Sequence, residues 1–178
     1  MSVLKIAKLG HPVLRKRATE LTLDEISSPK IQKLIADMKE TVIDADGAGL
    51  AAPQVHESKR IALLSIDEFE DIQVWINPVI THLSDELIIT FEGCLSVPQM
   101  RGAVARTSHI RVQGYNEHAQ AFDIELEGYS AVVAQHEYDH LDGIIYVDRV
   151  EPGTLAFLDE YKKYRGFLFS MLAEDEGE

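Results

Sequence analysis

The sequence predicts one α+β domain, with small mixed or antiparallel sheets around a central helix and further helices near the N-terminus and C-terminus. Three observations predict this class. The chain has 178 residues, enough for one domain with a sizeable core. Its hydrophobic share of 46% and charged share of 26% are typical of globular proteins. Helical and alternating apolar patterns follow one another without a repeat or linker, so we expect residues 1–178 to form a single unit.

The first helical pattern follows Ser28 and Pro29, which suit the N-cap and the first turn of a helix. Apolar residues then recur on one helical face, namely Ile31, Leu34, Ile35, Met38 and Val42. We expect this N-terminal helix to end near Asp46 and Gly47, because glycine commonly follows a helix end.

Strand patterns occupy the middle of the chain. The expected strands are residues 60–66, 73–76 and 87–91. Asn77 and Pro78 indicate a break after the second strand, and Gly93 lies just beyond the third. Apolar and polar residues alternate between Ile110 and Leu126 around a turn-like segment, which predicts a β-hairpin.

The pattern becomes helical again over residues 130–141, the expected central helix. Residues 144–147 form a short apolar run that predicts a strand. A final helix is expected over 154–172, with Gly166 as a weak point inside it. Acidic residues dominate 173–178, which we expect to form a frayed and solvated tail.

Composition restricts the partners and the compartment. Lys and Arg number 17 against 30 Asp and Glu, so the formal charge is −13 and the chain repels phosphate backbones on average. No apolar run approaches the length of a membrane span, and the N-terminus lacks a secretory pattern. The single cysteine cannot form an intramolecular disulfide. We therefore expect a cytoplasmic monomer with neither DNA nor a membrane as a direct partner.

The central helix carries a His-Glu-x-x-His pattern. His136 and His140 lie four residues apart, so both imidazoles face the same side and can reach one metal ion. Glu137 lies about 100° further around the helix axis, beside such an ion and within reach of its water. Two histidines leave coordination positions open, as a catalytic site requires. The pattern also occurs by chance in roughly one chain of this length in a few hundred.

A third ligand is needed, and Cys94 is the candidate. It follows a strand and Gly93, where the backbone can bend and approach closely. A lone cysteine is most often a small buried apolar residue, and that interpretation remains open. As a ligand, its thiolate would favour iron, zinc or nickel.

A glycine-rich segment ends in Gln54. It comprises Gly47, Ala48, Gly49, Leu50, Ala51, Ala52, Pro53 and Gln54. The simplest interpretation is a helix end followed by a turn of small residues. The segment lacks the Lys-Ser/Thr ending of a phosphate loop. The functional interpretation is a tightly packed loop that directs the Gln54 amide toward a substrate oxygen.

These three segments, in this order, resemble those of the bacterial-type, iron-dependent peptide deformylase family. The matching segments are the one ending in Gln54, the segment Glu-Gly-Cys-Leu-Ser around Cys94, and the segment Gln-His-Glu-Tyr-Asp-His-Leu around Glu137. The resemblance extends from residues 10–15 to Asp148 and Arg149, and so covers about the first 150 residues.

The resemblance implies a metal-dependent hydrolase that removes the formyl group from N-formyl-methionine of newly synthesised proteins and releases formate. Cys94, His136 and His140 would hold Fe²⁺, with Zn²⁺, Ni²⁺ or Co²⁺ as substitutes. Glu137 would act as general base. Gln54 and the backbone N–H of Leu95 would stabilise the oxyanion together with the metal.

The resemblance also implies a pocket for the methionine side chain. Its residues would be Ala48, Gly49, Tyr129, Val132 and Val133. The last three precede His136 by seven, four and three positions and share its helical face, although ordinary core residues show the same spacing. Arg101 would bind the peptide backbone, or would be a solvated surface arginine.

Two other classes of function remain open. A His-Glu-x-x-His metallopeptidase would use a ligand other than Cys94, and a non-catalytic metal or redox protein would need neither Glu137 nor Gln54. Some relatives dock on the ribosome through a basic C-terminal helix. Here Lys162, Lys163 and Arg165 precede the acidic tail, which argues against ribosome docking.

Overall fold

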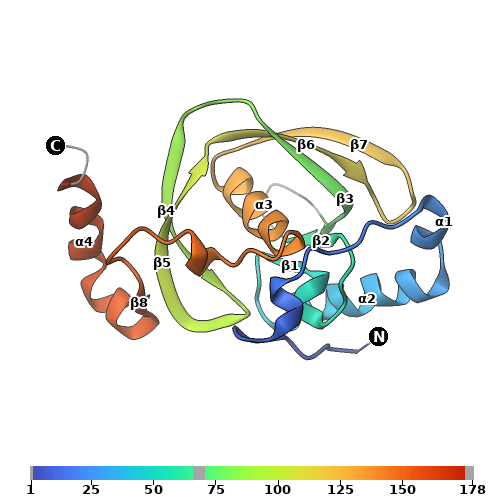
Figure 1. Ribbon diagram of the computed structural model, residues 1–178, viewed down its shortest axis with the longest axis horizontal. Helices are drawn as coiled ribbons and strands as arrows, with labels where there is room; N and C mark the ends of the chain where they lie inside the picture. Colours follow the sequence, from blue (N-terminus) through green and yellow to red (C-terminus); the bar gives the residue numbers. More distant parts are fainter. Residues whose placement is uncertain (1, 66–70, 175–178) are drawn as a thin grey trace.

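The computed structural model describes residues 2–65 and 71–174. Two antiparallel sheets surround helix α3 (Gly128–Leu141), which lies at the centre of the molecule in Figure 1. Helices α2 (Pro29–Asp44) and α4 (Leu158–Glu174) lie toward opposite ends of the view. The predicted α+β class is therefore confirmed. In the part of the chain that is described, every helix is too short or too polar to span a bilayer.

The larger sheet has five strands in the order β1-β2-β3-β6-β7. These are β1 (Gly49–Ala51), β2 (Ile61–Leu64), β3 (Gln73–His82), β6 (His109–Tyr115) and β7 (Ala121–Glu127). Strands β6 and β7 form the predicted hairpin. Strand β1 was not predicted, because three residues are too few to show an alternating pattern. The far end of the strand expected at 60–66 lies outside the described residues.

Helices cover both faces of this sheet. All four residues of β2 are buried, because Ile61 and Leu63 face α2 while Leu64 faces α3. The apolar stripe predicted for α2 supplies the buried residues Ile31, Ile35, Met38 and Val42. The Ser28 side chain accepts a hydrogen bond from the Ile31 N–H, so the predicted N-cap is confirmed. The helix ends at Asp44, slightly before the expected position.

The break predicted at Asn77 and Pro78 is wrong, because β3 continues through both residues to His82. A β-bulge between Ile76 and Val79 accommodates the proline, which has no N–H to donate to the next strand. Asn77 adopts a positive φ of 50°, and its side-chain amide exchanges two hydrogen bonds with the backbone of Leu21.

The smaller sheet has the order β4-β5-β8, formed by β4 (Leu87–Cys94), β5 (Val97–Thr107) and β8 (Ala156–Phe157). Strand β4 is longer than expected and includes Gly93. Strand β5 was not predicted, because proline, glycine and two arginines interrupt its apolar pattern. The last helix begins at Leu158 rather than 154, since the preceding residues pair with β5.

One local prediction near the C-terminus is wrong. Residues 144–147 are not a strand, because this apolar run enters the core as a turn of 3-10 helix (Tyr146–Asp148) without strand partners. Inside α4, the backbone is irregular at Tyr164, with φ −116° and ψ 16°, two residues before Gly166. Helix α4 reaches Glu174, and residues 175–178 of the expected tail lie outside the described residues.

The N-terminal segment joins the parts of the chain that carry the three motifs. It runs past a short helix, α1 (Leu23–Ile26), before α2. The Ala7 N–H donates to the Gln54 carbonyl at 2.7 Å, and the Leu9 N–H donates to the Ser96 carbonyl at 2.8 Å. The Ala18 N–H donates to the carbonyl of Leu141, the last residue of α3, at 2.8 Å. Residues 7–18 therefore connect the three motif segments through backbone hydrogen bonds.

Candidate metal centre and active site

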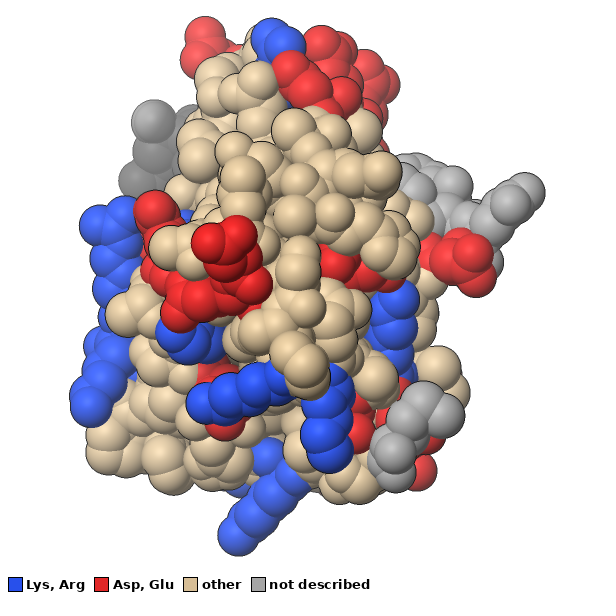
Figure 2. All heavy atoms as spheres, turned by 90° about the vertical axis from the view of Figure 1, so that its right-hand side faces the viewer, with Lys and Arg blue, Asp and Glu red and all other residues tan. Residues whose placement is uncertain are grey.

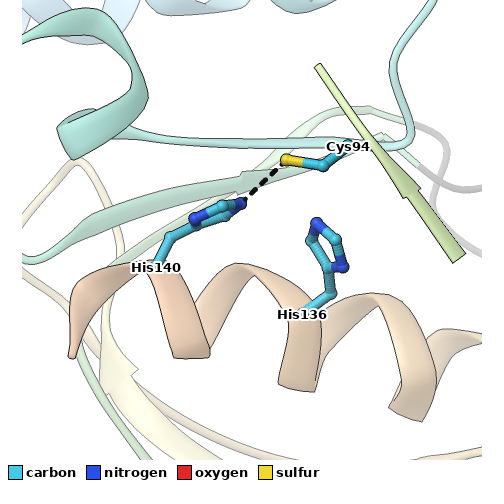
Figure 3. Close-up of side chains that lie close together, drawn as sticks. All are labelled: Cys94, His136 and His140. Atoms are coloured by element: carbon cyan, nitrogen blue, oxygen red, sulfur yellow. Dashed lines mark hydrogen bonds between the residues drawn. The ribbon is translucent and has the colours of Figure 1, made fainter. Parts of the chain in front are cut away.

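Three potential metal ligands converge between β4 and α3. Cys94 is the last residue of β4, and His136 and His140 point toward it from consecutive turns of α3 (Figure 3). Their donor atoms all lie within 4.8 Å of one another, and Cys94 Sγ lies 3.2 Å from His140 Nε2. The three side chains that the sequence suggested as ligands thus meet at one point.

The chemistry of this donor set fits a divalent transition metal. Zinc and similar ions take cysteine sulfur and histidine nitrogen as ligands at about 2.0–2.3 Å. His136 Nδ1 bonds Glu92 Oε2 at 2.7 Å, which leaves its Nε2 free for the centre. Such a hydrogen bond to the outer nitrogen is the usual way in which a ligating histidine is oriented. The arrangement therefore meets the requirements of a metal site.

The charges around Cys94 favour a thiolate. Burial alone would raise the pKa of its thiol, but the charge of His140 and hydrogen bonds from both histidines hold that pKa well below its ordinary value. Burial likewise opposes ionisation of Glu92, yet hydrogen bonds from His136 and Arg106 lower its pKa to about 2. These surroundings therefore favour the anionic forms of the Cys94 sulfur and of the Glu92 carboxylate behind His136.

Glu137 lies beside the three donors and is 4% exposed. Burial raises the pKa of its carboxyl to about 7, against the opposing charges of His136 and His140. Within the described part of the chain, its Oε2 is buried without a hydrogen-bond partner. A Cβ on Gly49 would lie 2.5 Å from Glu137 Oε1, so only glycine in β1 allows this approach. The Glu137 carboxylate thus packs against Gly49 of β1, and its Oε2 has no hydrogen-bond partner among the described residues.

Gln54 presents its amide to the same site. Its Oε1 accepts the Ala51 N–H at 2.7 Å, which directs Nε2 toward Cys94 Sγ at 3.4 Å and Ser96 Oγ at 3.3 Å. The next residue after the cysteine, Leu95, is half-buried, and its carbonyl accepts a hydrogen bond from Lys8 Nζ at 2.8 Å. Two potential hydrogen-bond donors to a developing negative charge, the Gln54 side-chain amide and the Leu95 backbone N–H, therefore lie next to Cys94.

A cavity of about 600 Å³ opens onto these groups. Its lining includes every residue that the sequence suggested for the site except His140, which is 1% exposed and lies deeper. Val132 and Val133 are buried in its wall, while Tyr129 is 63% exposed. Ala48 and the other predicted residues from β1 and β4 complete the lining. The cavity is large enough for a methionine side chain with some of the following peptide.

Arg101 is a half-buried residue of this cavity and not a solvated surface arginine. Its guanidinium lies across Gly93, where a Cβ would come within 1.9 Å of Nη1. Nη1 also donates to the Met100 carbonyl at 2.9 Å. Any side chain at position 93 would therefore displace the Arg101 guanidinium, so Gly93 is needed for the position of Arg101 as well as for the path of β4.

The sequence did not reveal two charged residues that support the site. Glu92 bonds His136 directly, although its position in the chain suggested only the end of a strand. Arg106, 4% exposed, donates to both carboxylate oxygens of Glu92. Glu92 is separated by 44 residues from His136, so no local periodicity relates the two. The one available signal was a charged residue directly before the Gly-Cys pair.

Comparison with known proteins agrees with this geometry. The sequence model of a family described as polypeptide deformylase matches residues 3–155. A peptide deformylase of Leptospira biflexa is 42% identical over 169 residues, which cover 90% of this chain and 94% of the relative. One of Halothermothrix orenii is 45% identical over 150 residues, which cover 84% and 95%.

Solved structures agree as well. The crystal structure of peptide deformylase from Thermotoga maritima superposes with a TM-score of 0.80 at 38% identity, over 85% of this chain and all of that one. A class I type b peptide deformylase from Acinetobacter baumannii, solved with Met-Ala-Ser bound, gives a TM-score of 0.79 at 34% identity, over 84% of this chain and all of that one.

Proposed function

The chain belongs to the polypeptide deformylase family and is a hydrolase that removes the N-formyl group from nascent peptides, and on that premise we propose that Cys94, His136 and His140 hold its metal. The family is metal-dependent, and the convergence of these three donor atoms within 4.8 Å is the observation that carries the proposal. When bound, the metal supplies Lewis acidity to a water molecule and to the formyl oxygen.

Glu137 is the proposed general base. Its unpartnered Oε2 accepts a proton from the attacking water as the water oxygen forms its bond to the formyl carbon. When the bond between the formyl carbon and nitrogen breaks, the same carboxyl returns the proton to the departing amine, and formate leaves. One residue can serve both steps because the same carboxylate stays beside the reacting atoms, in the space that Gly49 leaves for it.

Gln54 and Leu95 are the proposed donors to the oxyanion. The amide of Gln54 is held by Ala51, so its Nε2 needs no reorientation when negative charge develops on the formyl oxygen. The backbone N–H of Leu95 is the second donor. Preorganised donors of this kind each contribute roughly 10²–10³-fold to the rate.

The methionine side chain is proposed to enter the part of the cavity lined by Ala48, Gly49, Tyr129, Val132 and Val133. The peptide that follows would run toward Arg101, whose guanidinium can donate to a peptide carbonyl. The relative from Acinetobacter baumannii, solved with Met-Ala-Ser, supports a cavity that accepts a methionine followed by two small residues.

Formate release from formyl-Met-Ala-Ser tests the proposal. The protein is loaded with Fe²⁺ without oxygen and compared with Glu137→Ala and with the matched control Glu125→Ala, an exposed residue of β7. We expect Glu137→Ala to lose about 10²–10⁴-fold in kcat and the control to retain activity. Equal release by all three proteins would contradict the role of Glu137.

The same assay separates the alternatives. A metallopeptidase would cleave internal bonds of an unformylated peptide, and a metal or redox protein without turnover would release no formate. We expect neither result, because a metallopeptidase would use a ligand other than Cys94, and a protein without turnover would need neither Glu137 nor the Gln54 amide. Parallel assays with Met-Ala-Ser and with a blocked longer peptide provide the comparison.

Fe²⁺ is the proposed native metal, with Zn²⁺, Ni²⁺ and Co²⁺ as substitutes. The support is the donor set, because a thiolate with two imidazoles suits these softer ions rather than magnesium or calcium. Metal analysis after anaerobic purification tests this, and a zinc-filled protein with little iron would contradict it. Loss of activity in air, reversed by adding Fe²⁺ with a reductant, would agree with it.

We further propose a cytoplasmic monomer that works without docking on the ribosome. Lys and Arg side chains lie among Asp and Glu side chains on the face shown in Figure 2, rather than forming a uniformly basic surface there. In α4, Lys163 is already paired with Glu160 at 2.7 Å. Sedimentation with ribosomes at low and physiological salt tests the proposal, and light scattering gives the oligomeric state.

A further inference from the structure

A line of buried ion pairs runs from His136 away from the cavity. Glu92 Oε2 lies 2.7 Å from His136 Nδ1. Arg106 grips the same carboxylate with two bonds, from Nε to Oε1 at 2.8 Å and from Nη2 to Oε2 at 3.0 Å. The Glu92 and Arg106 side chains are 5% and 4% exposed. The paired bonds hold the plane of the carboxylate against the imidazole.

A second carboxylate and a second arginine continue this line. The remaining nitrogen of Arg106, Nη1, donates to Asp139 Oδ2 at 2.5 Å. Arg149 then grips Asp139 from outside, with Nε to Oδ2 at 2.7 Å and Nη2 to Oδ1 at 2.8 Å. Its side chain is 44% exposed, so the line ends at the surface.

We propose that Arg149 and Asp139 are positioning residues for His136, which act on it through Arg106 and Glu92. This inference rests on the proposed metal site. Neither residue is part of the catalytic cavity as the structure describes it, and both line a separate hollow of about 230 Å³. The hydrogen bonds connect Arg149 to His136 through Asp139, Arg106 and Glu92.

The balance of charge explains why the outer arginine matters. Two guanidinium groups face two carboxylates, so the charges of these four groups balance. Without Arg149, the single charge of Arg106 is shared between Glu92 and Asp139, and one carboxylate remains partly uncompensated. Arg106 then moves toward Asp139, and its two hydrogen bonds to Glu92 weaken. His136 loses its fixed orientation, which is what a metal ligand of this kind requires.

The chain offers a matched control in Arg15. Its side chain is also 44% exposed and pairs with a carboxylate, that of Asp148, directly beside Arg149 in the sequence. Among the described residues, however, Arg15 has no hydrogen bond to the line that leads to His136. Arg15→Met and Arg149→Met therefore each remove an equally exposed arginine from an ion pair, although Asp148 is 36% and Asp139 8% exposed, and they differ in the connection to the metal site.

Co²⁺ is the probe, because it reports affinity and geometry without turnover. The dissociation constant is measured by competition with a chelator, and the visible absorption of the Co²⁺ protein reports the ligand geometry. Urea unfolding of the metal-free variants measures their stability separately. Arg149→Lys is included because it keeps the positive charge but loses the two parallel hydrogen bonds to Asp139. It also provides a folded variant to measure if Arg149→Met unfolds.

We expect Arg149→Met to bind Co²⁺ about tenfold more weakly, with altered absorption, and Arg149→Lys to lie between it and the wild type. Arg15→Met should match the wild type in both measurements. Asp139→Asn should reduce the affinity for Co²⁺ less in the Arg149→Met protein than in the wild type. The two losses are not additive because both residues act through the same ion pairs.

Two results would overturn the proposal. One is a wild-type spectrum and affinity in both Arg149 variants, and the other is an equal loss in Arg15→Met. Failure of the wild-type protein itself to bind Co²⁺ would instead contradict the proposed metal site, and this inference with it.

Discussion

Helices α3 and α4 are similar in length, with 14 and 17 residues, but their surroundings differ. In α3, every residue from 130 to 141 except Tyr138 is buried, with His136 and Glu137 in the cavity lining and Asp139 in the ion pairs. In α4, Tyr164 and Phe167 are 57% and 65% exposed, whereas Leu168 is buried. The family match ends at residue 155, before α4 begins.

This contrast shows where structural freedom lies in the molecule. Each side of α3 contacts a specific partner: Glu137 touches β1, His136 touches β4, and Asp139 touches the arginines. Close-packed interiors tolerate little change of volume, so substitutions there should alter chemistry and stability together. Tyr161 and Phe169 of helix α4 pack on Phe91 of the smaller sheet, and among the described residues of this helix Leu158 lines the cavity, so substitutions beyond Leu158 should affect stability alone.

Among the substitutions that test this contrast, the largest effect is expected from Gly49→Ala, next to α3. The added methyl group would meet Glu137 Oε1 at 2.5 Å and must displace the carboxylate. We expect kcat for formate release to fall about 100-fold, since a displacement of about 1 Å has that effect. The unfolding free energy should fall by about 1–3 kcal/mol, as for other overpacked sites.

Gly114→Ala in β6 is the matched control, because its methyl group would also be crowded, 3.0 Å from the Ile76 carbonyl oxygen. It lies outside the catalytic cavity. It should lower stability in urea unfolding without lowering kcat. A fully active Gly49→Ala protein would show that β1 does not determine the position of Glu137.

A smaller effect is expected from Tyr161→Ala in α4. The Tyr161 ring centroid lies 4.9 Å from that of Phe91 in β4, and such pairs contribute about 0.5–1.5 kcal/mol beyond their burial. We expect the unfolding free energy to fall by about 1–2 kcal/mol, with kcat unchanged. Tyr164→Ala, at an exposed position of the same helix, should leave both unchanged. A large loss of kcat in Tyr161→Ala would remove the distinction between the two helices.

The smallest effect has the opposite sign. A Cβ on Gly166 would meet nothing within 4 Å, and glycine inside a helix costs about 0.5–1 kcal/mol relative to alanine. Gly166→Ala should therefore raise the unfolding free energy by up to that amount, measured in urea or by thermal unfolding. A destabilised variant would mean that the irregular turn at Tyr164 depends on the glycine.

Sequence patterns predicted the elements that are regular over several turns or alternations. The apolar stripe of α2 and the β6–β7 hairpin followed from spacing alone, because their buried faces repeat at a constant period. Strand β5 did not, because Arg106 points from it into the interior, where ion pairs with Glu92 and Asp139 make a buried arginine tolerable. Residues 144–147 were mistaken for a strand because a buried apolar run has the same composition whether or not a strand pairs with it.

The sequence by itself determined the pair His136 and His140 and the neighbouring Glu137. Four residues along a helix bring two side chains together in any fold, so this part of the site is local. Its motifs also determined which family the chain resembles, which the comparisons confirm.

Only the tertiary structure decided how Cys94 meets His140 across 46 residues of chain, and which groups stand behind them. The closeness of Gly49 to Glu137, the position of Arg101 over Gly93, and the ion pairs from His136 to Arg149 all depend on how α3 lies between the two sheets. Contacts of this kind join elements that are distant in sequence. They arise from the packing of buried surfaces and the compensation of buried charge, neither of which has a period along the chain.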